Sequence, residues 1–370
     1  MEATFICEYI WLDNWNNLRS KTKVLHNWDF EKKGMPMWNY DGSSTGQAEG
    51  NDSEIFIKPV KIVPDPFREH PNALLVLCDN WIIDKAESVN ETVYKPHPGN
   101  TRFKTYQLFK NNHVNEENPW FGFEQEFFFT KFKSMKDIPL GMCKKSDTGI
   151  TTWLSLSGEK QKNNYCGTGS KYIFGRKLAD EVLMRLLYSN ITCTGLNFEV
   201  APGQCEFQIF GENIDAADSL LLFRYILQRS AEEYDYDINY HPKPMDGDWN
   251  GSGCHTNFST KTIRDNNSWD TIEEYISSLK ENHNIHIENY GDDNKKRLTG
   301  EHETASWEKF TSGVADRGAS IRIPSQTFYN KSGYIEDRRP SSNCDPYVVM
   351  YHLINTTLEP QKHPNQEAIV

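Results

Sequence analysis

One segment has the spacing of a β-strand and carries two acids on a single face. It reads Phe121-Gly-Phe-Glu-Gln-Glu-Phe-Phe-Phe129. Because successive side chains of a strand point to opposite faces, Glu124 and Glu126 share one face, about 7 Å apart along the strand. Paired acids are commonly a solvated surface, but here they lie among five phenylalanines. We therefore favour a ligand-binding or catalytic strand over a surface strand.

The composition excludes several classes of protein. The 370 residues suggest two domains, and 40 basic against 52 acidic residues give a net charge of −12. This balance argues against a non-specific nucleic-acid or anionic-membrane binder. No apolar run approaches the roughly 20 residues of a membrane helix, and no signal peptide is visible. We expect a soluble, cytoplasmic protein with no nucleic-acid or membrane partner. Its eight cysteines form no C-x-x-C pair, so we expect reduced thiols.

The order of elements predicts an α+β chain of two domains, residues 1–84 and 95–370. Short strands are expected first, with a loop at Trp38–Thr45 and a linker near Ile83–Pro98. These strands are Tyr9–Leu12, Lys23–His26, Ile55–Ile57, Val60–Val63 and Ala73–Asp79. Helices alternate with strands afterwards. They are Arg176–Ser189, a helix capped by Asp215, Trp269–Asn282 and a helix from Asp345-Pro346 to Thr357.

Further polar side chains share faces of other predicted strands. Glu199 and Glu206 flank a turn at Pro202-Gly203. His255 lies on a strand that follows the glycine-rich stretch Asn250-Gly-Ser-Gly253, where a ligand can approach the backbone closely. Tyr334, Glu336 and Arg338 alternate along Gly333–Pro340. By itself, His255 or the Gly333–Pro340 segment is at least as well explained by a structural role.

Taken together, these segments predict a metal-dependent site. Five glutamates in one pocket would repel one another strongly unless divalent cations lay between them. Oxygen ligands with one imidazole favour Mg²⁺ or Mn²⁺ over a soft metal. Arginines facing metal-bound carboxylates are typical of phosphoryl transfer. From the residues alone we expect a metal-dependent, ATP-using enzyme with an anionic co-substrate.

A series of motifs resembles eukaryotic-type (type II) glutamine synthetase. In chain order they are YDGSST, FGFEQEF, the Glu199–Glu206 stretch, NGSGCHTNFSTK, RLTGEHE, ASIRIP and GYIEDRRPSSNCDPY. The resemblance runs from about Tyr9 to the Leu358 region, and the ordered series is very specific. It implies a small N-terminal β-grasp domain and a larger catalytic domain with a curved antiparallel sheet flanked by helices. It also implies a homo-oligomer, a decamer of two pentameric rings with active sites between subunits.

The resemblance implies a role for each matching residue. Two or three Mg²⁺ (or Mn²⁺) ions per site would be held by two groups, Glu126 with Glu199 and Glu206, and Glu124 with His255 and Glu336. Substrate glutamate would contact Glu124, Asn250, Gly251, His255, Arg297, Arg317 and Arg338. ATP would lie among Trp120, Ser259, Arg264 and Tyr334, with its phosphates at Arg317, Arg322 and Arg338. The catalytic residues would be Asp41, Glu303, Arg317 and Arg338.

The implied reaction is ATP-dependent synthesis of L-glutamine from L-glutamate and ammonia. Phosphorylation of the glutamate side chain gives γ-glutamyl phosphate, which has a good leaving group, and ADP. Ammonium cannot attack until it is deprotonated, so Asp41 of a neighbouring subunit and Glu303 on a flap would attract the cation and accept its proton. Attack of ammonia then releases phosphate.

Three alternatives compete with this interpretation. A ligase of the same fold could join glutamate to a larger amine, although the anionic pair Asp41 and Glu303 suits a small cation. A catalytically inactive structural relative would be expected to lose metal-binding acids or arginines, and none is lost. An unrelated metal-binding module would not explain the ordered motifs.

The sequence departs from the family pattern at a few places. The chain begins close to its first strand, so we expect the family's N-terminal arm to be largely missing. Glu301 stands where the flap usually has an apolar residue, and Asp316 where asparagine is usual before the arginine. The Lys160–Tyr172 stretch is more polar than is typical. None of these changes removes a predicted ligand.

Overall fold

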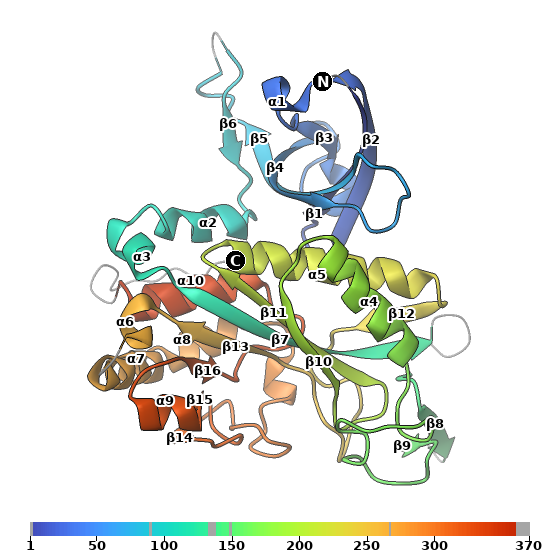
Figure 1. Cartoon of the computed structure of the whole chain (residues 1–370), viewed down its shortest axis with the longest axis vertical. Coiled ribbons are helices and arrows are strands. Elements are labelled where there is room, and N and C mark those ends of the chain that lie inside the picture. Colours follow the sequence, from blue (N-terminus) through green and yellow to red (C-terminus); the bar gives the residue numbers. More distant parts are fainter. Residues whose placement is uncertain (1–2, 89–90, 132–137, 148–149, 266–267, 360–370) are drawn as a thin grey trace. The chain divides into compact units, whose positions relative to one another are not determined.

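The computed structural model describes residues 3–88, 91–131, 138–147, 150–265 and 268–359 (Figure 1). The chain forms two compact units. The first runs to Gln107 and includes Arg185–Ile191, and the second comprises Leu108–Met184 and the chain from Thr192. The domain limits expected at residues 84 and 95 stay a prediction.

The first unit is built on one mixed sheet with the order β2-β1-β5-β4-β3, and β6 also pairs with β5. Strands β1 and β5 are parallel, and the remaining neighbours are antiparallel. Alternate residues of β1, among them Cys7, Tyr9 and Trp11, enter its core. The strands are β1 (Ala3–Leu12), β2 (Leu18–Trp28), β3 (Trp38–Asp41), β4 (Glu54–Pro64), β5 (Ala73–Ile83) and β6 (Tyr94–Pro96). The helices are α1 (Phe30–Lys33), η1 (Gly42–Thr45) and α2 (Thr101–Leu108).

Three predictions for this unit need correction. The strands expected at 55–57 and 60–63 are one strand, β4, because a register shift between Pro59 and Lys61 accommodates the proline. The loop expected at 38–45 contains β3 and η1, and the side chain of Asp41 accepts a hydrogen bond from Ser43 N–H (3.1 Å) where they meet. The expected linker contains β6.

The second unit is built on a larger sheet with the order β10-β11-β7-β13-β16-β15-β14, and β12 also pairs with β7. All of its pairs are antiparallel except β14 with β15. The long strand β7 lies between β11 and β13 (Figure 1). The strands are β7 (Trp120–Lys131), β10 (Cys193–Phe198), β11 (Gln204–Glu212), β12 (Tyr236–Asn239), β13 (Cys254–Ser259), β14 (Ser312–Val314), β15 (Ile321–Ile323) and β16 (Ile335–Asp337).

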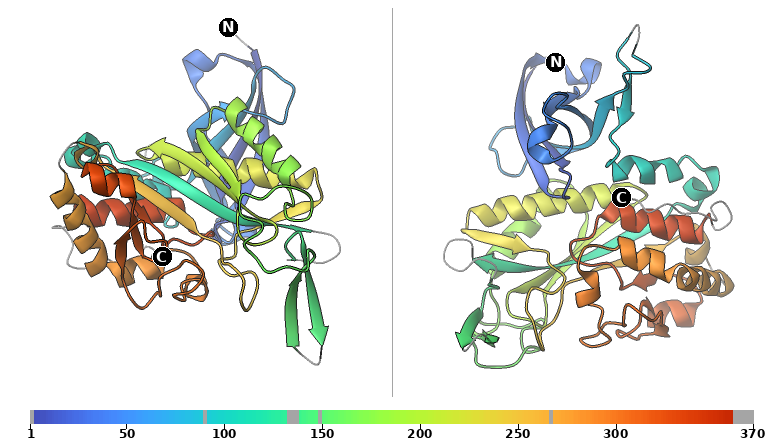
Figure 2. Two further views of the ribbon diagram at one scale, coloured as in Figure 1. Left: turned by 60° about the horizontal axis from the view of Figure 1, so that its bottom comes forward. Right: turned by 180° about the vertical axis from the view of Figure 1, so that it is seen from behind.

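Helices pack against this sheet, and a hairpin projects from it. Helix α5 contacts β7, β11 and β12, and α10 contacts α5, α7 and α8. Strands β8 (Met142–Asp147) and β9 (Ile150–Ser155) form a hairpin that extends away from the main sheet (Figure 2). The helices are α3 (Asn112–Glu117), α4 (Arg176–Tyr188), α5 (Asp215–Glu232), α6 (Lys261–Arg264), α7 (Trp269–Glu281), α8 (His283–Asn289), η2 (Asn294–Lys296), α9 (Ser325–Asn330) and α10 (Pro346–Thr357).

The helix predictions are confirmed except for one cap. Asp345 caps α10, because its side chain accepts a hydrogen bond from Tyr347 N–H at 2.8 Å. Asp215 was expected to cap α5, but it lies in the first turn, and Ile214 holds the cap position without a side-chain bond. Across the described ranges, no helix is long and apolar enough to cross a membrane.

Candidate active site

The register of β7 brings the predicted acids together. Glu126 lies opposite Glu206 of β11, and Glu124 lies opposite His255 of β13. Cross-strand partners have Cβ atoms about 5 Å apart, so pairing alone places these side chains within reach of one another. Gln125, between the two acids, points to the other face, where Arg224 of α5 donates to its Oε1 (2.8 and 2.6 Å). Strand β7 therefore carries the acids on one face, and the hydrogen bonds from Arg224 to Gln125 hold it from the opposite face.

The first group of acids is Glu126, Glu199 and Glu206. One carboxylate oxygen from each lies within 4.8 Å of the others. Gly253 N–H donates to Glu126 Oε2 at 2.6 Å, and Gln208 Nε2 donates to Glu206 Oε1 at 3.0 Å. Burial and then the charge of Glu199 raise the pKa of Glu126 to about 8. Burial and the neighbouring carboxylates also raise the pKa of Glu206 well above its ordinary value. Such a cluster fits a cation with hard oxygen ligands.

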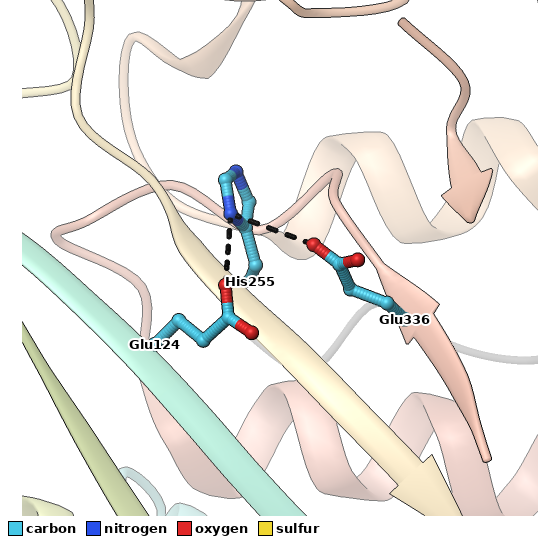
Figure 3. A group of neighbouring side chains, drawn as sticks. All are labelled: Glu124, His255 and Glu336. Carbon is cyan, nitrogen blue, oxygen red and sulfur yellow. Dashed lines mark ion pairs between the residues drawn. The ribbon is translucent and has the colours of Figure 1, made fainter. Parts of the chain in front are cut away.

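The second group is Glu124, His255 and Glu336, which point toward one another from three adjacent strands (Figure 3). His255 Nδ1 lies 3.5 Å from Glu124 Oε2 and 3.8 Å from Glu336 Oε1. Burial, and then the charge of Arg338, holds the pKa of His255 well below its ordinary value. A neutral imidazole can ligate a metal through a ring nitrogen. Both groups match the sequence-based sets residue for residue, and each fits a divalent cation.

Arginines surround the second group. Arg322 NH1 donates to Glu336 Oε2 at 2.5 Å, and Arg338 NH1 donates to Glu336 Oε1 at 2.6 Å. Arg297 is buried, and its NH2 donates to three backbone carbonyls, those of residues 338, 339 and 340, at 2.9–3.1 Å. Burial lowers the pKa of Arg297 to about 10. The site therefore places fixed positive charge beside its acids, as binding of anionic groups requires.

The first group, and Glu124 and His255 of the second, line one cavity of about 1060 Å³. Eleven of the predicted site residues line it: Glu124, Glu126, Glu199, Glu206, Asn250, Gly251, His255, Arg297, Glu303, Arg317 and Arg338. Glu303 is exposed on the loop that follows Arg297. The volume is large enough for a small polar substrate.

Five of the residues predicted for ATP lie outside the lining of this cavity, whereas Arg317 and Arg338, predicted at its phosphates, line it: the five are Trp120, Ser259, Arg264, Arg322 and Tyr334. Trp120 pairs in register with Ser259, and the guanidinium of Arg264 lies 4.0 Å from the centre of the Trp120 ring. Tyr334 is 42% exposed. Glu336 links the two sets, because it belongs to the second acidic group and binds Arg322.

Asp41 belongs to the first unit and does not line the cavity. It is exposed at the start of η1, where Ser43 Oγ and Ser44 Oγ donate to its carboxylate at 2.7 and 2.8 Å. These hydrogen bonds lower the pKa of Asp41. Its carboxylate is therefore anionic and open to solvent.

The sequence left several lining residues without a role. Gln161, Asp248 and His302 line the cavity, as do Trp153 and Trp249. Gln161 lies in the stretch that stood out only for its polarity, and His302 lies inside the RLTGEHE motif. The polar character of these segments was the available signal, but no periodicity marked a face.

A buried polar cluster lies on the other side of β16. Arg339 donates to Asp337 through Nε and NH2 at 2.8 and 2.7 Å, and the pair is 1% and 0% exposed. Histidines of α8 complete the cluster, since Arg339 NH2 lies 2.9 Å from His286 Nδ1 and its NH1 lies 3.3 Å from His283 Nδ1. This cluster fixes the strand whose opposite face carries Glu336 and Arg338.

Comparison with known proteins decides the family. A family model described as glutamine synthetase, catalytic domain, matches residues 101–285, and one described as glutamine synthetase, beta-Grasp domain, matches residues 5–81. The chain belongs to the glutamine synthetase family.

Similar proteins support the same conclusion. A protein of Acanthamoeba polyphaga mimivirus is 43% identical over 358 residues, 96% of this chain and 94% of its own. A glutamine synthetase cytosolic isozyme of Daucus carota is 42% identical over 355 residues, 96% of this chain and 95% of its own. A glutamine synthetase of Kluyveromyces lactis is 43% identical over 349 residues, 94% of this chain and 87% of its own.

The match confirms the predicted α+β fold with an N-terminal β-grasp domain. The family synthesises glutamine, so the prediction of a glutamate–ammonia ligase is confirmed at that level. Relatives are named as both cytosolic and chloroplastic isozymes, and the compartment of this chain stays a prediction.

Proposed function

We propose that this protein joins L-glutamate to ammonia through γ-glutamyl phosphate, with ATP as phosphoryl donor and Mg²⁺ or Mn²⁺ held by the two acidic groups. The observation that carries the proposal is the pair of groups, one purely carboxylate and one with an imidazole, each with a member on the same face of β7 and each with members that line a single cavity. When bound, the cations would neutralise the acids and polarise phosphoryl oxygens.

The cavity supplies contacts for glutamate. Arg297 and Arg338 present guanidinium groups for carboxylates, and the backbone of Gly251 lies beside Arg297. A Cβ at position 251 would lie 2.5 Å from Pro242 O and 2.6 Å from Arg297 Cγ, so only glycine fits there. We assign Asn250, Gly251 and His255, with Glu124 and the arginines Arg297, Arg317 and Arg338, to glutamate binding.

The set outside the cavity suits the nucleotide. Trp120 and Arg264 offer a stacking surface, and Arg322 is poised beside Glu336 at the junction with the cavity. We assign Trp120, Ser259, Arg264 and Tyr334 to ATP, and Arg317, Arg322 and Arg338 to its phosphates. The arginines would stabilise charge on the transferred phosphoryl group.

Two exposed acids complete the proposal. Glu303 stands at the cavity, where it would attract ammonium and accept its proton. Asp41 would do the same from a neighbouring copy of the chain, which requires a homo-oligomer. We propose a cytoplasmic decamer of two pentameric rings, and sedimentation velocity would distinguish ten subunits from five or one.

The deciding experiment measures phosphate release from ATP with glutamate and Mg²⁺, with and without ammonium, and identifies the product by mass. Ammonium-dependent release with glutamine formed would support the proposal. Release that depends instead on a larger amine would favour a glutamate–amine ligase. No turnover by folded protein that binds Mg²⁺-ATP would favour an inactive relative.

A further inference from the structure

The loop that carries Glu303 is held at its root. We define the flap as residues 299–306, which a β-bridge between Thr299 and Ser306 closes. Thr304 Oγ1 donates to Arg297 O and Glu301 O at 3.2 and 2.8 Å. The root is therefore anchored to the buried Arg297, while the tip needs other contacts to hold its position.

The tip of the flap adopts an unfavourable backbone conformation. His302 and Glu303 have φ angles of 53° and 60°. The backbone of residues other than glycine rarely adopts this left-handed region. Two such residues in succession persist only where the surrounding structure holds them. One such contact is made by Arg338 NH2, which donates to Glu303 O at 3.2 Å.

The imidazole of His302 supplies the other contacts. Its Nδ1 lies 3.4 Å from Gln161 Nε2, and its Nε2 lies 3.5 Å from Asp248 Oδ1. Gln161 Oε1 in turn accepts a hydrogen bond from Asn250 N–H at 2.8 Å. One set of roles satisfies all three contacts: the Gln161 amide donates to Nδ1, and Nε2–H donates to Asp248.

This arrangement links three segments of the cavity wall. His302 belongs to the flap, Gln161 to the polar 160–172 stretch, and Asn250 to the glycine-rich segment that we assign to glutamate. Both contacts of the imidazole are long for hydrogen bonds. The side chain of Asp248 is 83% exposed, so its contact contributes little. Gln161 is therefore the principal partner.

We propose that His302 is a positioning residue that, through Gln161, couples glutamate at Asn250 to placement of Glu303 over the cavity. The inference rests on the proposed function. When the flap is misplaced, water attacks the γ-carbon of the acyl phosphate and the bond from that carbon to the phosphate oxygen breaks. Glutamate and phosphate form, and ATP is consumed without glutamine.

The experiment compares wild type with His302→Ala, His302→Asn and Gln161→Ala, and measures phosphate release, glutamine formation and Mg²⁺-ATP binding. Wild type should release phosphate and glutamine in equal amounts. His302→Ala should lower kcat/KM for ammonium by about tenfold to 100-fold, the scale of a small misplacement, and release excess phosphate. Mg²⁺-ATP affinity should not change. Asparagine keeps an acceptor near the Nδ1 position, so it should restore part of the coupling.

The double variant tests the link directly. His302→Ala with Gln161→Ala should lose no more kcat/KM for ammonium than Gln161→Ala alone, because His302 acts through Gln161, which also holds Asn250 N–H. His241→Ala is a matched control: His241 Nε2 lies 3.2 Å from Asp293 Oδ2, but neither residue lines the cavity. This control should keep the wild-type kcat/KM for ammonium and the wild-type ratio of phosphate to glutamine.

Several results would overturn the inference. One is a wild-type ratio of phosphate to glutamine in both His302→Ala and Gln161→Ala. Another is a loss of kcat/KM for ammonium in the double variant that equals the sum of the two single losses in free energy. If wild type itself forms no glutamine, the proposed function fails first. If His302→Ala does not fold, Gln161→Ala alone decides, since it removes the contact with His302 and the hydrogen bond from Asn250 N–H, and so the whole link.

Discussion

Protonation of one buried histidine should set part of the acid sensitivity of the chain. His352 on α10 is 2% exposed, and within the described residues neither of its ring nitrogens has a hydrogen-bond partner. Its ring centre lies 5.3 Å from that of His286, which contacts Arg339. Burial, and then the charge of Arg339, lowers the pKa of His352 from 6.5 to about 4.

The sign and size of the effect follow from that shift. Because the folded-state pKa is lower, the unfolded chain binds the proton first, and stability is lost as the pH falls from 6.5 toward 4. At pH 8 the imidazole is neutral in the folded and the unfolded chain, whereas at pH 5 proton binding to His352 in the unfolded chain lowers the unfolding free energy by about 2 kcal/mol. His352→Leu should therefore reduce the loss of unfolding free energy between pH 8 and pH 5 by about 2 kcal/mol.

Urea unfolding at pH 8 and pH 5 measures this difference, at one protein concentration because association would add to the apparent stability. His26→Leu, which removes an exposed imidazole of β2, is the control. Between pH 8 and pH 5 it should lose as much unfolding free energy as wild type does. An equal loss in wild type and His352→Leu would show that His352 does not control the acid sensitivity.

Three further predictions concern the site and its support. Mn²⁺ added at pH 7 should release protons, because the Glu126 pKa near 8 leaves that carboxyl mostly protonated before the metal binds. The Glu126→Gln variant should release roughly one proton fewer per site. Calorimetry in buffers of different ionisation enthalpy measures the number of protons released, and equal numbers in the two proteins would contradict the prediction. Arg339→Met should cost about 3–5 kcal/mol in urea unfolding, because Asp337 is left buried without a counter-charge, and a loss below about 1 kcal/mol would refute that reasoning. Glu303→Ala should leave ATP and glutamate binding intact while reducing ammonium-dependent turnover; unchanged glutamine formation would remove Glu303 from the mechanism.

Strand periodicity was sufficient to predict much of the site. Alternation placed Glu124 and Glu126 on one face, and the structure adds that this face meets Glu206 on one neighbour and His255 on the other. Partner strands and their register depend on contacts distant in sequence, which one segment does not encode. The assignment into two groups came from the family resemblance rather than from spacing.

The supporting contacts lay beyond the reach of sequence patterns. Alternation along β16 and the residues after it predicts that Asp337 and Arg339 face away from Glu336. It does not predict that His283 and His286 of α8 lie beside Arg339 on that face. Gln161 and His302 likewise meet across 141 residues in loops without periodicity. Loop conformation is set by tertiary contacts, so only the folded chain shows such pairs.

The central position of β7 has a consequence for how this protein can change over generations. Both acidic groups take one member from β7, at positions two residues apart. Deleting or inserting one codon between the start of this strand and Glu124 would turn both acids to the opposite face at once, toward the side of Arg224. The two groups are therefore inherited together: point substitutions can alter either one, but a length change in this strand abolishes both.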